Sequence, residues 1–338
     1  MHRLPPRAFM VVALVLLALA VLLGLLVGPV KIAPVKLLTL WSADQDMDGR
    51  VLELIRLPRV LLAALVGACL ASCGAVMQGL FRNPLADPSL IGVSSGASVG
   101  ASCVIFFGGF GFLGSGLGLP AIAMGAFLGG MAATAVVYRL ATSVTGTSVS
   151  TMLLAGIAIT ALAGAATSLF GFFADNEMLR RISLWQMGNL DSANWSRVMV
   201  IAVVVIPLVF FLPREGRALN AMLLGESEAR HLGISVEQLK RRLIVLTALG
   251  VGVAVAVSGV VAFVGLIVPH LVRLLIGPDH RYLIPGSALL GAVLLLLADT
   301  GARTLMSPAE LPTGVITALL GAPFFVALLL RQRRDLVS

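Results

Sequence analysis

Long apolar runs constrain the fold of this chain more than any other feature of its sequence. The first run extends from Phe9 to Val30, which is longer than the core of a signal peptide, and no small-residue cleavage site follows it. A helix needs about 20 mostly apolar residues to cross the hydrocarbon core of a bilayer. Further runs that can span a membrane lie at 58–80, 90–107, 119–140, 149–173, 198–213, 243–267, 283–298 and 311–330.

The stretch from Leu266 to Gly277 is ambiguous, because Pro269, His270 and Arg273 interrupt it, and it forms either a short span or a re-entrant turn. With 59% hydrophobic and only 12% charged residues, no water-soluble fold could bury the apolar surface. Counting the ambiguous stretch as a span, we predict an all-α membrane protein. It is a polytopic bundle of about ten transmembrane helices, formed by residues 1–338 as a single domain.

The distribution of positive residues predicts the orientation of the bundle. With ten spans and a cytoplasmic N-terminus, 15 of the 24 Lys and Arg residues fall inside and 9 outside, in the sense of the positive-inside rule. Both termini are then cytoplasmic. The net charge of +8 is spread over the loops, so nucleic acid is a poor partner.

An internal repeat is visible at a constant offset of 185 residues, the difference between Gly67 and Gly252. Four Gly and Pro positions, namely Gly67, Gly74, Pro84 and Gly92, recur as Gly252, Gly259, Pro269 and Gly277. The second and seventh spans would then be oppositely oriented, which is the inverted-repeat signature of many transporters. A second small-residue pattern, Gly125-x-x-x-Gly129, predicts close helix packing.

Two sequence patterns predict where spans begin. Asp87-Pro88 has the form of an N-cap followed by a proline in the first turn, and it precedes the third span. Ser307-Pro-Ala-Glu310 has the form of a capping box, and it precedes the last span. We assign no function to either pattern.

The sequence lacks the motifs of several kinds of chemistry. No G-x-x-x-x-G-K-[ST] phosphate loop exists, and none of the three lysines (Lys31, Lys36 and Lys240) follows a glycine run. We therefore expect no ATP hydrolysis, no enzymatic activity and no permanently bound cofactor. The four histidines are scattered, which indicates no metal site. A secondary transporter would be expected to bury a carboxylate, but Asp299 and Arg303 lie close to an interface and span centres hold almost no ionisable residues.

Residues 214–239 form the longest cytoplasmic stretch. The pattern predicts two short helices hinged at Gly225, the second of which ends at Gly233. Mixed charges and three leucines (Leu223, Leu224 and Leu232) give the stretch an amphipathic face that suits docking of a partner. A solvated connector would have the same pattern.

The segment 174–197 leaves the fifth span on the outer side. Its adjacent Arg180 and Arg181 suit an anionic ligand, and the preceding Phe170, Phe172 and Phe173 suit a flat apolar ring. Trp185 and Trp195 also fit a different interpretation, an interfacial belt of Trp and Arg.

Motifs along nearly the whole chain, from about 56 to 330, resemble the permease subunits of iron-complex and cobalamin ABC importers, the FecCD family. The motifs follow in the family's order: Arg56-Leu-Pro-Arg59, Gly74-Ala-Val-Met-Gln78, Asn83-Pro-Leu-Ala-Asp-Pro88, Gly92-Val-Ser-Ser-Gly96, Leu153-Leu-Ala-Gly156, Leu224-Gly-Glu-Ser-Glu-Ala-Arg-His-Leu-Gly233, Gly265-Leu-Ile-Val-Pro-His270, Glu310-Leu-Pro-Thr-Gly314 and Leu320-Gly-Ala-Pro323. This order is more specific than any single motif.

The resemblance implies a ten-helix permease that works as a homodimer in the bacterial inner membrane. Two cytoplasmic ATPase subunits would dock on it and use the ATP, and a periplasmic binding protein would deliver the substrate. The resemblance also identifies coupling helices, which would pass the closure of the ATPases to the spans. The residues implied in ATPase coupling are Gly225, Glu226, Ser227, Glu228, Ala229, Arg230, Leu232 and Gly233.

Further roles are carried over from the family to matching positions. Three arginines would face acidic residues of the binding protein, although such residues also anchor proteins to lipid headgroups: Arg56, Arg59 and Arg303. Four residues would form the cytoplasmic gate, or ordinary turns: Asn83, Leu85, Ser148 and Val149. Four residues would line the substrate pathway: Phe170, Phe173, Arg180 and Arg181.

The sequence resembles most closely the family's haem permeases, then those for ferric siderophores, then those for cobalamin. Two readings of a different kind stay open from the residues. An ion-coupled secondary transporter would work without an ATPase, and a structural membrane protein would have no use for gate-like loops.

Overall fold

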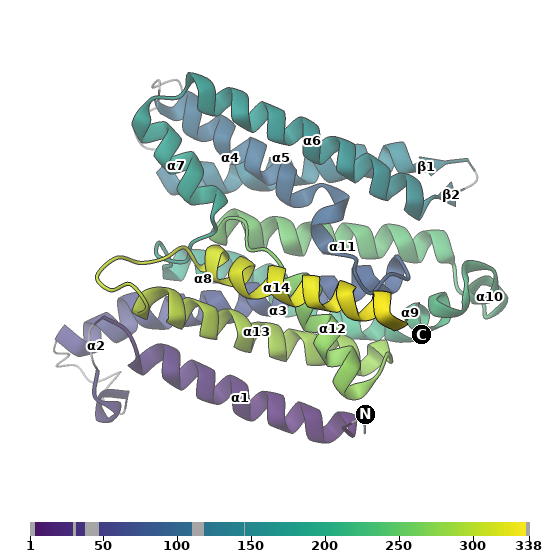
Figure 1. Cartoon of the computed structure of the whole chain (residues 1–338), viewed down its shortest axis with the longest axis horizontal. Coiled ribbons are helices and arrows are strands. Elements are labelled where there is room, and N and C mark those ends of the chain that lie inside the picture. The colour runs from purple at the N-terminus through teal and green to yellow at the C-terminus, as the bar shows by residue number, and fades with distance from the viewer. Residues whose placement is uncertain (1–3, 30–31, 38–46, 110–117, 145, 336–338) are drawn as a thin grey trace.

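The computed structural model describes residues 4–29, 32–37, 47–109, 118–144 and 146–335, and the described chain is helical almost throughout (Figure 1). Its apolar helices are α1 (Pro6–Leu26), α3 (Leu57–Leu80), α4 (Val93–Gly109), α5 (Gly118–Ala141), α6 (Val149–Phe173), α8 (Trp195–Phe211), α11 (Val236–Ser258), α12 (Val264–Ile276), α13 (His280–Thr304) and α14 (Thr313–Asp335). The shorter elements are η1 (Pro34–Leu37), α2 (Met47–Val51), η2 (Leu52–Arg56), η3 (Pro88–Ile91), α7 (Asn176–Gln186), η4 (Leu212–Glu215), α9 (Gly216–Leu224), α10 (Glu226–His231) and the two-residue strands β1 (Thr142–Ser143) and β2 (Gly146–Thr147).

Within the described residues, 7 helices are long and apolar enough to cross a membrane, and three apolar helices are shorter. The prediction of an all-α membrane protein with about ten apolar helices is therefore confirmed. Two of the long spans continue without a break into short elements. One runs from Met47 to Leu80 through the π-helical turn η2, and the other runs from Trp195 to Leu224 through η4 into α9.

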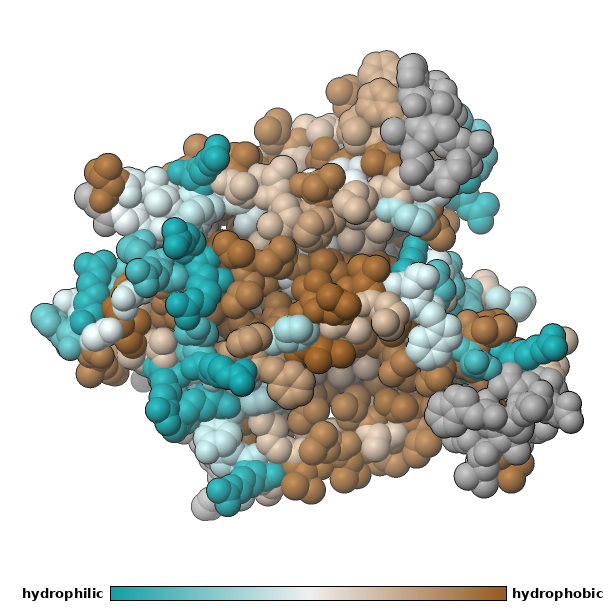
Figure 2. Space-filling model, turned by 180° about the vertical axis from the view of Figure 1, so that it is seen from behind, coloured by the Kyte–Doolittle hydropathy of each residue, from teal (hydrophilic) through white to brown (hydrophobic). Residues whose placement is uncertain are grey.

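The two ends of the bundle differ in what they carry (Figure 1). The start of α1 and the end of α14 lie at the same end as α9, α10 and the β1–β2 hairpin, which we call the α10 end. The opposite end carries α2 and α7, and we call it the α7 end. Between the two ends, Figure 2 shows a broad apolar surface with hydrophilic residues gathered at its margins, as expected of a chain surrounded by lipid.

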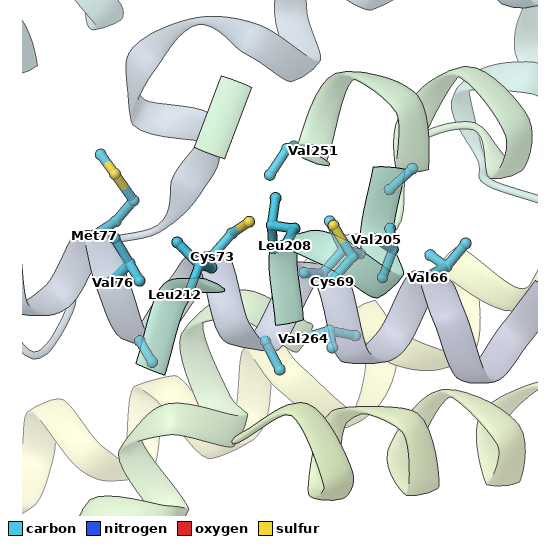
Figure 3. Packing of buried hydrophobic residues seen from close by; sticks show 14 of the residues in the cluster. Val66, Cys69, Cys73, Val76, Met77, Val205, Leu208, Leu212, Val251 and Val264 are labelled. Carbon is cyan, nitrogen blue, oxygen red and sulfur yellow. The ribbon is translucent and has the colours of Figure 1, made fainter. Parts of the chain in front are cut away.

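The helix α3 is the centre of the core and packs against α8, α11, α12 and α13. Small residues let the backbones approach: a side chain at Gly74 would overlap the carbonyl group of Gly265 in α12. On another side of α3, Cys69 and Cys73 pack beside Leu208 of α8 (Figure 3). These three side chains converge on Gly250 of α11, where a Cβ would lie 2.7 Å from the Leu208 Cδ1 atom.

The helices α4 and α5 are joined by glycines on both sides. A side chain at Gly96 would overlap Gly129, and one at Gly100 would overlap Gly125. The predicted packing role of Gly125-x-x-x-Gly129 is confirmed, and its partner is a second motif of the same spacing in α4.

The predicted span 243–267 is wrong at its C-terminal end. The helix α11 ends at Ser258, and residues 259–263 form a non-helical link before α12. The physical reason is the backbone: Gly259 and Phe263 have φ values of 69° and 67°, in the left-handed region that cannot continue a helix. The ambiguous stretch around Pro269 is a separate helix of 13 residues, not a turn.

The predicted repeat is correct in direction and wrong in detail. Figure 1 shows that α3 runs from the α7 end toward the α10 end and α11 runs back, so the two helices are oppositely oriented. Two of the four matched pairs, however, fall in unlike places. Gly74 lies within α3 but Gly259 follows the end of α11, and Pro84 lies in a turn but Pro269 lies within α12. Helices and links differ in length between the two halves of the chain, so equivalent positions are not all separated by the same number of residues.

The two predicted caps have different outcomes. Asp87 accepts a hydrogen bond from the Ser89 amide at 2.8 Å, as an N-cap does, but it opens the short η3 turn, and α4 begins only at Val93. The capping box at 307–310 is wrong. The helix α14 begins at Thr313, and the Glu310 carboxylate binds a buried arginine instead of a backbone amide.

Candidate coupling, gating and docking sites

Two short helices lie at the α10 end of the bundle: α9 packs against α3 and α13, and α10 projects beyond them (Figure 1). The two short helices are separated by Gly225, with φ of 128°, and α10 is followed by Gly233, with φ of 82°. Residues with a side chain rarely adopt such angles, so glycine is needed at both positions. Leu224 and Leu232, on either side of α10, are 70% and 64% exposed. The prediction of two short helices hinged at Gly225 is confirmed, and apolar side chains flank the second.

The residues implied in ATPase coupling divide into two groups. Ser227, Glu228 and Arg230 are exposed on α10 and are open to a partner. Ala229 is fully buried, so it fixes the helix to the bundle. The Glu226 side chain, which is 28% exposed, faces Lys240 of α11.

Lys240 lies at the centre of a polar cluster at this end. Its side chain is only 2% exposed, and its ammonium group donates to the Glu226 carboxylate at 2.8 Å, to the Glu237 carboxylate at 3.2 Å and to the Thr147 carbonyl oxygen at 2.8 Å. The Glu237 carboxylate also accepts the Thr147 amide at 2.8 Å. We call Lys240, Glu226, Glu237 and Thr147 the Lys240 cluster. All three donor positions of the ammonium are used.

A second polar contact joins α9 to the start of α13. The Asn220 side chain donates to Asp279 at 2.7 Å and accepts from the His280 backbone amide at 2.9 Å; the His280 Nδ1 atom also lies 2.9 Å from the Asn220 carbonyl oxygen. Hydrogen bonds from Arg281, and then from Asn220, lower the pKa of Asp279 to about 2, which keeps this helix-capping carboxylate charged.

The predicted gate residues lie in a turn and at a helix start. Asn83 accepts the Leu85 amide at 2.9 Å within the turn after α3, and Ser148 caps α6 by accepting the Thr151 amide at 3.3 Å. Val149 is half-buried and packs against the core. These contacts show turn and cap chemistry at each position, and the gating role stays a prediction.

At the α7 end, the three arginines predicted to meet a binding protein are buried within the chain. Arg59 donates to both Asp299 oxygens, at 3.0 and 3.1 Å, and to Glu310 at 2.7 Å. Arg303 lies 3.2 Å from Asp299 and donates to the Gly24 carbonyl oxygen at 3.0 Å. We call Arg56, Arg59, Arg303, Asp299 and Glu310 the Arg59 cluster.

The binding-protein contact of these arginines stays a prediction, and within this chain all three are buried. Each is about 3–4% exposed, and Arg56 donates to the Leu25 carbonyl oxygen at 2.6 Å. Buried charges are stable only when they are paired and hydrogen-bonded, and carboxylates of this chain already supply the pairing. Only Glu310, whose side chain is 33% exposed, reaches the surface in this cluster.

The residues predicted to line the substrate pathway lie at the end of α6 and on α7. Phe170 packs on Phe106 between α6 and α4, with ring centroids 5.4 Å apart, so it lies within the chain. Phe173 is exposed and stacks edge-on with Phe172. Arg180 is exposed on α7, and Arg181 pairs with Glu177 at 2.9 Å. Phe170 is half-buried and the other three residues are exposed, and their role in the substrate pathway stays a prediction.

A groove that sequence reasoning missed lies between α4, α6 and α7. It has a volume of about 550 Å³, and its polar lining consists of hydroxyl and amide groups, among them Ser95, Ser98, Thr160, Ser183 and Gln186. Small and hydroxyl residues recur every three to four positions along α6, at Thr160, Gly164, Thr167 and Gly171, and this spacing is the signal that could have predicted the groove.

In the part of the chain that the structure describes, no three His, Cys, Asp or Glu side chains gather as a metal site.

Comparison with known proteins decides the family. The profile of the FecCD transport family matches residues 16–331. The chain belongs to the FecCD transport family. Its relatives include the hemin transport system permease protein HmuU of Yersinia pestis, with 46% identity over 98% of both chains. The vitamin B12 import system permease protein BtuC of Salmonella paratyphi A is 42% identical over 94% of both chains.

Solved structures agree with this FecCD permease in fold. An ABC transporter assigned to the metal-chelate type, solved in an inward-facing conformation, has a TM-score of 0.84 and 34% identity, and it covers 96% of this chain and 99% of its own. The family resemblance predicted from the motifs is confirmed, and the chain is a multi-pass permease of the ABC transporter type. The roles of the coupling, gate and docking residues in this FecCD permease stay predictions.

Proposed function

We propose that this FecCD permease is the membrane subunit of an ATP-driven importer that moves haem from the periplasm to the cytoplasm. The observation that carries the proposal is the 46% identity, over 98% of both chains, with a permease named for hemin transport. The groove of hydroxyl and amide groups beside α6 supports it, because neutral hydrogen-bonding groups hold an iron complex weakly enough to release it.

The energy would come from two separate ATPase subunits, since the chain carries no phosphate loop. The docking element would be α10 with its flanking Leu224 and Leu232, which are apolar and exposed at the α10 end. The chain itself would be neither an ATPase nor the holder of a permanent cofactor. A homodimer, with the pathway along its axis, is the assembly that the family resemblance implies.

The α10 end would face the cytoplasm of a bacterial cell, and the chain would lie in the inner membrane. The excess of Lys and Arg in the loops at this end, 15 of 24 in the predicted topology, supports that orientation. Both termini would then be cytoplasmic. The α7 end, with the segment 174–197, would face a periplasmic binding protein that delivers the cargo.

The test is uptake by the reconstituted transporter. Proteoliposomes that contain the permease and its ATPase, with the binding protein outside and ATP inside, are expected to accumulate haem and to ignore uncouplers. A permease carrying Leu224→Asp and Leu232→Asp is expected to lose uptake and to lose co-purification of the ATPase, because charges replace the apolar docking face. Uptake that needs no ATPase would contradict the mechanism.

Cobalamin is the second candidate cargo, because permeases named for vitamin B12 import are 42% identical over 94% of the chain. The same vesicles are offered haem, a ferric siderophore or cobalamin. ATP-dependent uptake of cobalamin or of the siderophore without haem would keep the import mechanism and reject haem.

A further inference from the structure

Lys240, the buried lysine of α11, contacts partners from three different elements of the fold. Each partner of the Lys240 ammonium belongs to a different element: Glu226 begins α10, Glu237 lies in the first turn of α11 and Thr147 ends β2. A buried ammonium is costly unless such partners satisfy it. One charged group therefore holds together a projecting helix, a long span and a hairpin.

Few side chains of α10 fix it to the bundle. Its flanking glycines, Gly225 and Gly233, have open space where a Cβ would stand. Of its side chains, Ala229 is buried, and within the described part of the chain Glu226 alone hydrogen-bonds outside the helix. Besides the chain connections to α9 and α11 and the packing of Ala229, the contact between Glu226 and Lys240 therefore gives a force on α10 a polar route to α11 and the hairpin.

The hairpin side of the cluster leads directly to α6. Thr147 is held by both its carbonyl oxygen, on Lys240, and its amide, on Glu237. The next residue, Ser148, is the N-cap of α6, the helix that lines the hydroxyl groove. A displacement of the Lys240 ammonium thus acts on the first turn of α6 without an intervening flexible residue.

We propose that Lys240 is the positioning residue that makes α10 and the entry of α6 move together. In this arrangement α10, the β1–β2 hairpin and the start of α6 shift as one body when the ATPases close. Lysine suits the position because its single ammonium can donate to three acceptors at the end of a flexible stem. The inference rests on the proposed ATP-driven function, and it adds the group that connects the docking element to the entry of α6.

The first test measures rigidity in the wild-type transporter. Spin labels are placed at His231→Cys in α10 and Val144→Cys at the tip of the hairpin, both exposed, with Cys103→Ser as background because Cys69 and Cys73 are buried. The distance between the two labels of one subunit is compared without nucleotide and with ADP and vanadate. We expect the same distance in both states, and a shift of its distribution in the wild type would overturn the proposal.

The second test removes the charge. Lys240→Met keeps most of the stem, and we expect haem uptake per ATP hydrolysed to fall by about tenfold while ATPase activity of the assembled complex remains. In this variant the distance between labels should change with nucleotide. Lys240→Arg, which retains a positive charge and several donors, should recover part of the uptake.

The matched control is Arg242→Met, two residues further along α11, which breaks an exposed ion pair with Glu215. It should leave the uptake per ATP unchanged. If Lys240→Met fails to assemble, the neutral combination of Lys240→Met, Glu226→Gln and Glu237→Gln leaves no uncompensated charge and should show the same uncoupling.

The outcomes separate the two proposals. If the wild type takes up none of the three cargoes, the proposed function fails. If the wild type takes up its cargo and the assembled Lys240→Met transporter keeps normal uptake per ATP, this inference fails alone. Equal losses of ATPase activity and uptake would also overturn it, because Lys240 would then only hold the docking site together.

Discussion

The Lys240 cluster and the Arg59 cluster are both buried ionic networks, but they join different kinds of element. The Lys240 cluster has one cation and two carboxylates, and it connects a six-residue helix and a hairpin to α11. The Arg59 cluster has three cations and two carboxylates, and it connects α3 and α13, together with the chain just before α14. One cluster ties small projecting elements to a span, and the other ties spans to each other.

The carboxylates of the two clusters also differ in how far they are exposed to solvent. Asp299 is almost fully buried between Arg59 and Arg303, whereas Glu226 and Glu237 are 28% and 41% exposed. Water can therefore compensate the Lys240 carboxylates when the cation is lost, but it cannot reach Asp299. We therefore expect the loss of a charge to cost more stability at the α7 end than at the α10 end.

The largest effect on stability is expected from Asp299→Asn. It leaves Arg59 and Arg303 buried without their shared carboxylate, which typically costs about 3–5 kcal/mol. The thermal midpoint of the purified permease in detergent should fall by more than for Lys240→Met. Equal shifts for the two variants would contradict the contrast between the clusters.

A smaller effect is expected from Glu310→Gln. The amide oxygen of glutamine can still accept from Arg59, and the side chain is partly exposed, so the loss should be about 1 kcal/mol. The measurement is again the thermal midpoint, with the exposed Arg242→Met as a control near zero. A loss as large as that of Asp299→Asn would mean that Glu310, and not Asp299, is the main counter-ion of Arg59.

The smallest effect is expected at Asp279, the N-cap of α13, which belongs to neither cluster. Its pKa is lowered from 3.8 to about 2, so the folded state favours the carboxylate. The resulting stability is present above about pH 4 and is lost as the pH falls toward 2. The difference in thermal midpoint between wild type and Asp279→Asn should shrink over that range. A difference that stays constant down to pH 2 would show that the charge of Asp279 is not what stabilises the start of α13.

Sequence reasoning found the features that are local in the chain. The apolar run at 149–173 has the bounds of α6, and the hinge at Gly225 follows from a glycine between two short helical patterns. It missed the end of α11 because apolar residues continue through 259–263, and only the backbone angles of Gly259 and Phe263 show the break. An apolar run shows that a segment can lie in lipid, but it does not show where the backbone leaves the helical conformation.

The contacts of the two clusters could not be predicted in the same way. Arg59 and Asp299 are 240 residues apart, and Lys240 and Thr147 are 93 residues apart. The family resemblance implies that the arginines face a binding protein, and it gives no sign of carboxylate partners that lie so far away in this chain. The capping pattern at 307–310 failed for a related reason, since a buried guanidinium attracts the Glu310 carboxylate more strongly than a backbone amide does.

The paired glycines of α4 and α5 limit how a transport cycle can proceed. Gly96 meets Gly129 and Gly100 meets Gly125, backbone against backbone. If one helix slid along the other, residues with side chains, such as Ala101 or Leu128, would move into the positions of these glycines, and the axes would have to separate. The two helices are therefore expected to move together as a rigid pair. Alternating access in this transporter must then occur at other contacts, and a covalent cross-link between α4 and α5 should leave the turnover of cargo unchanged.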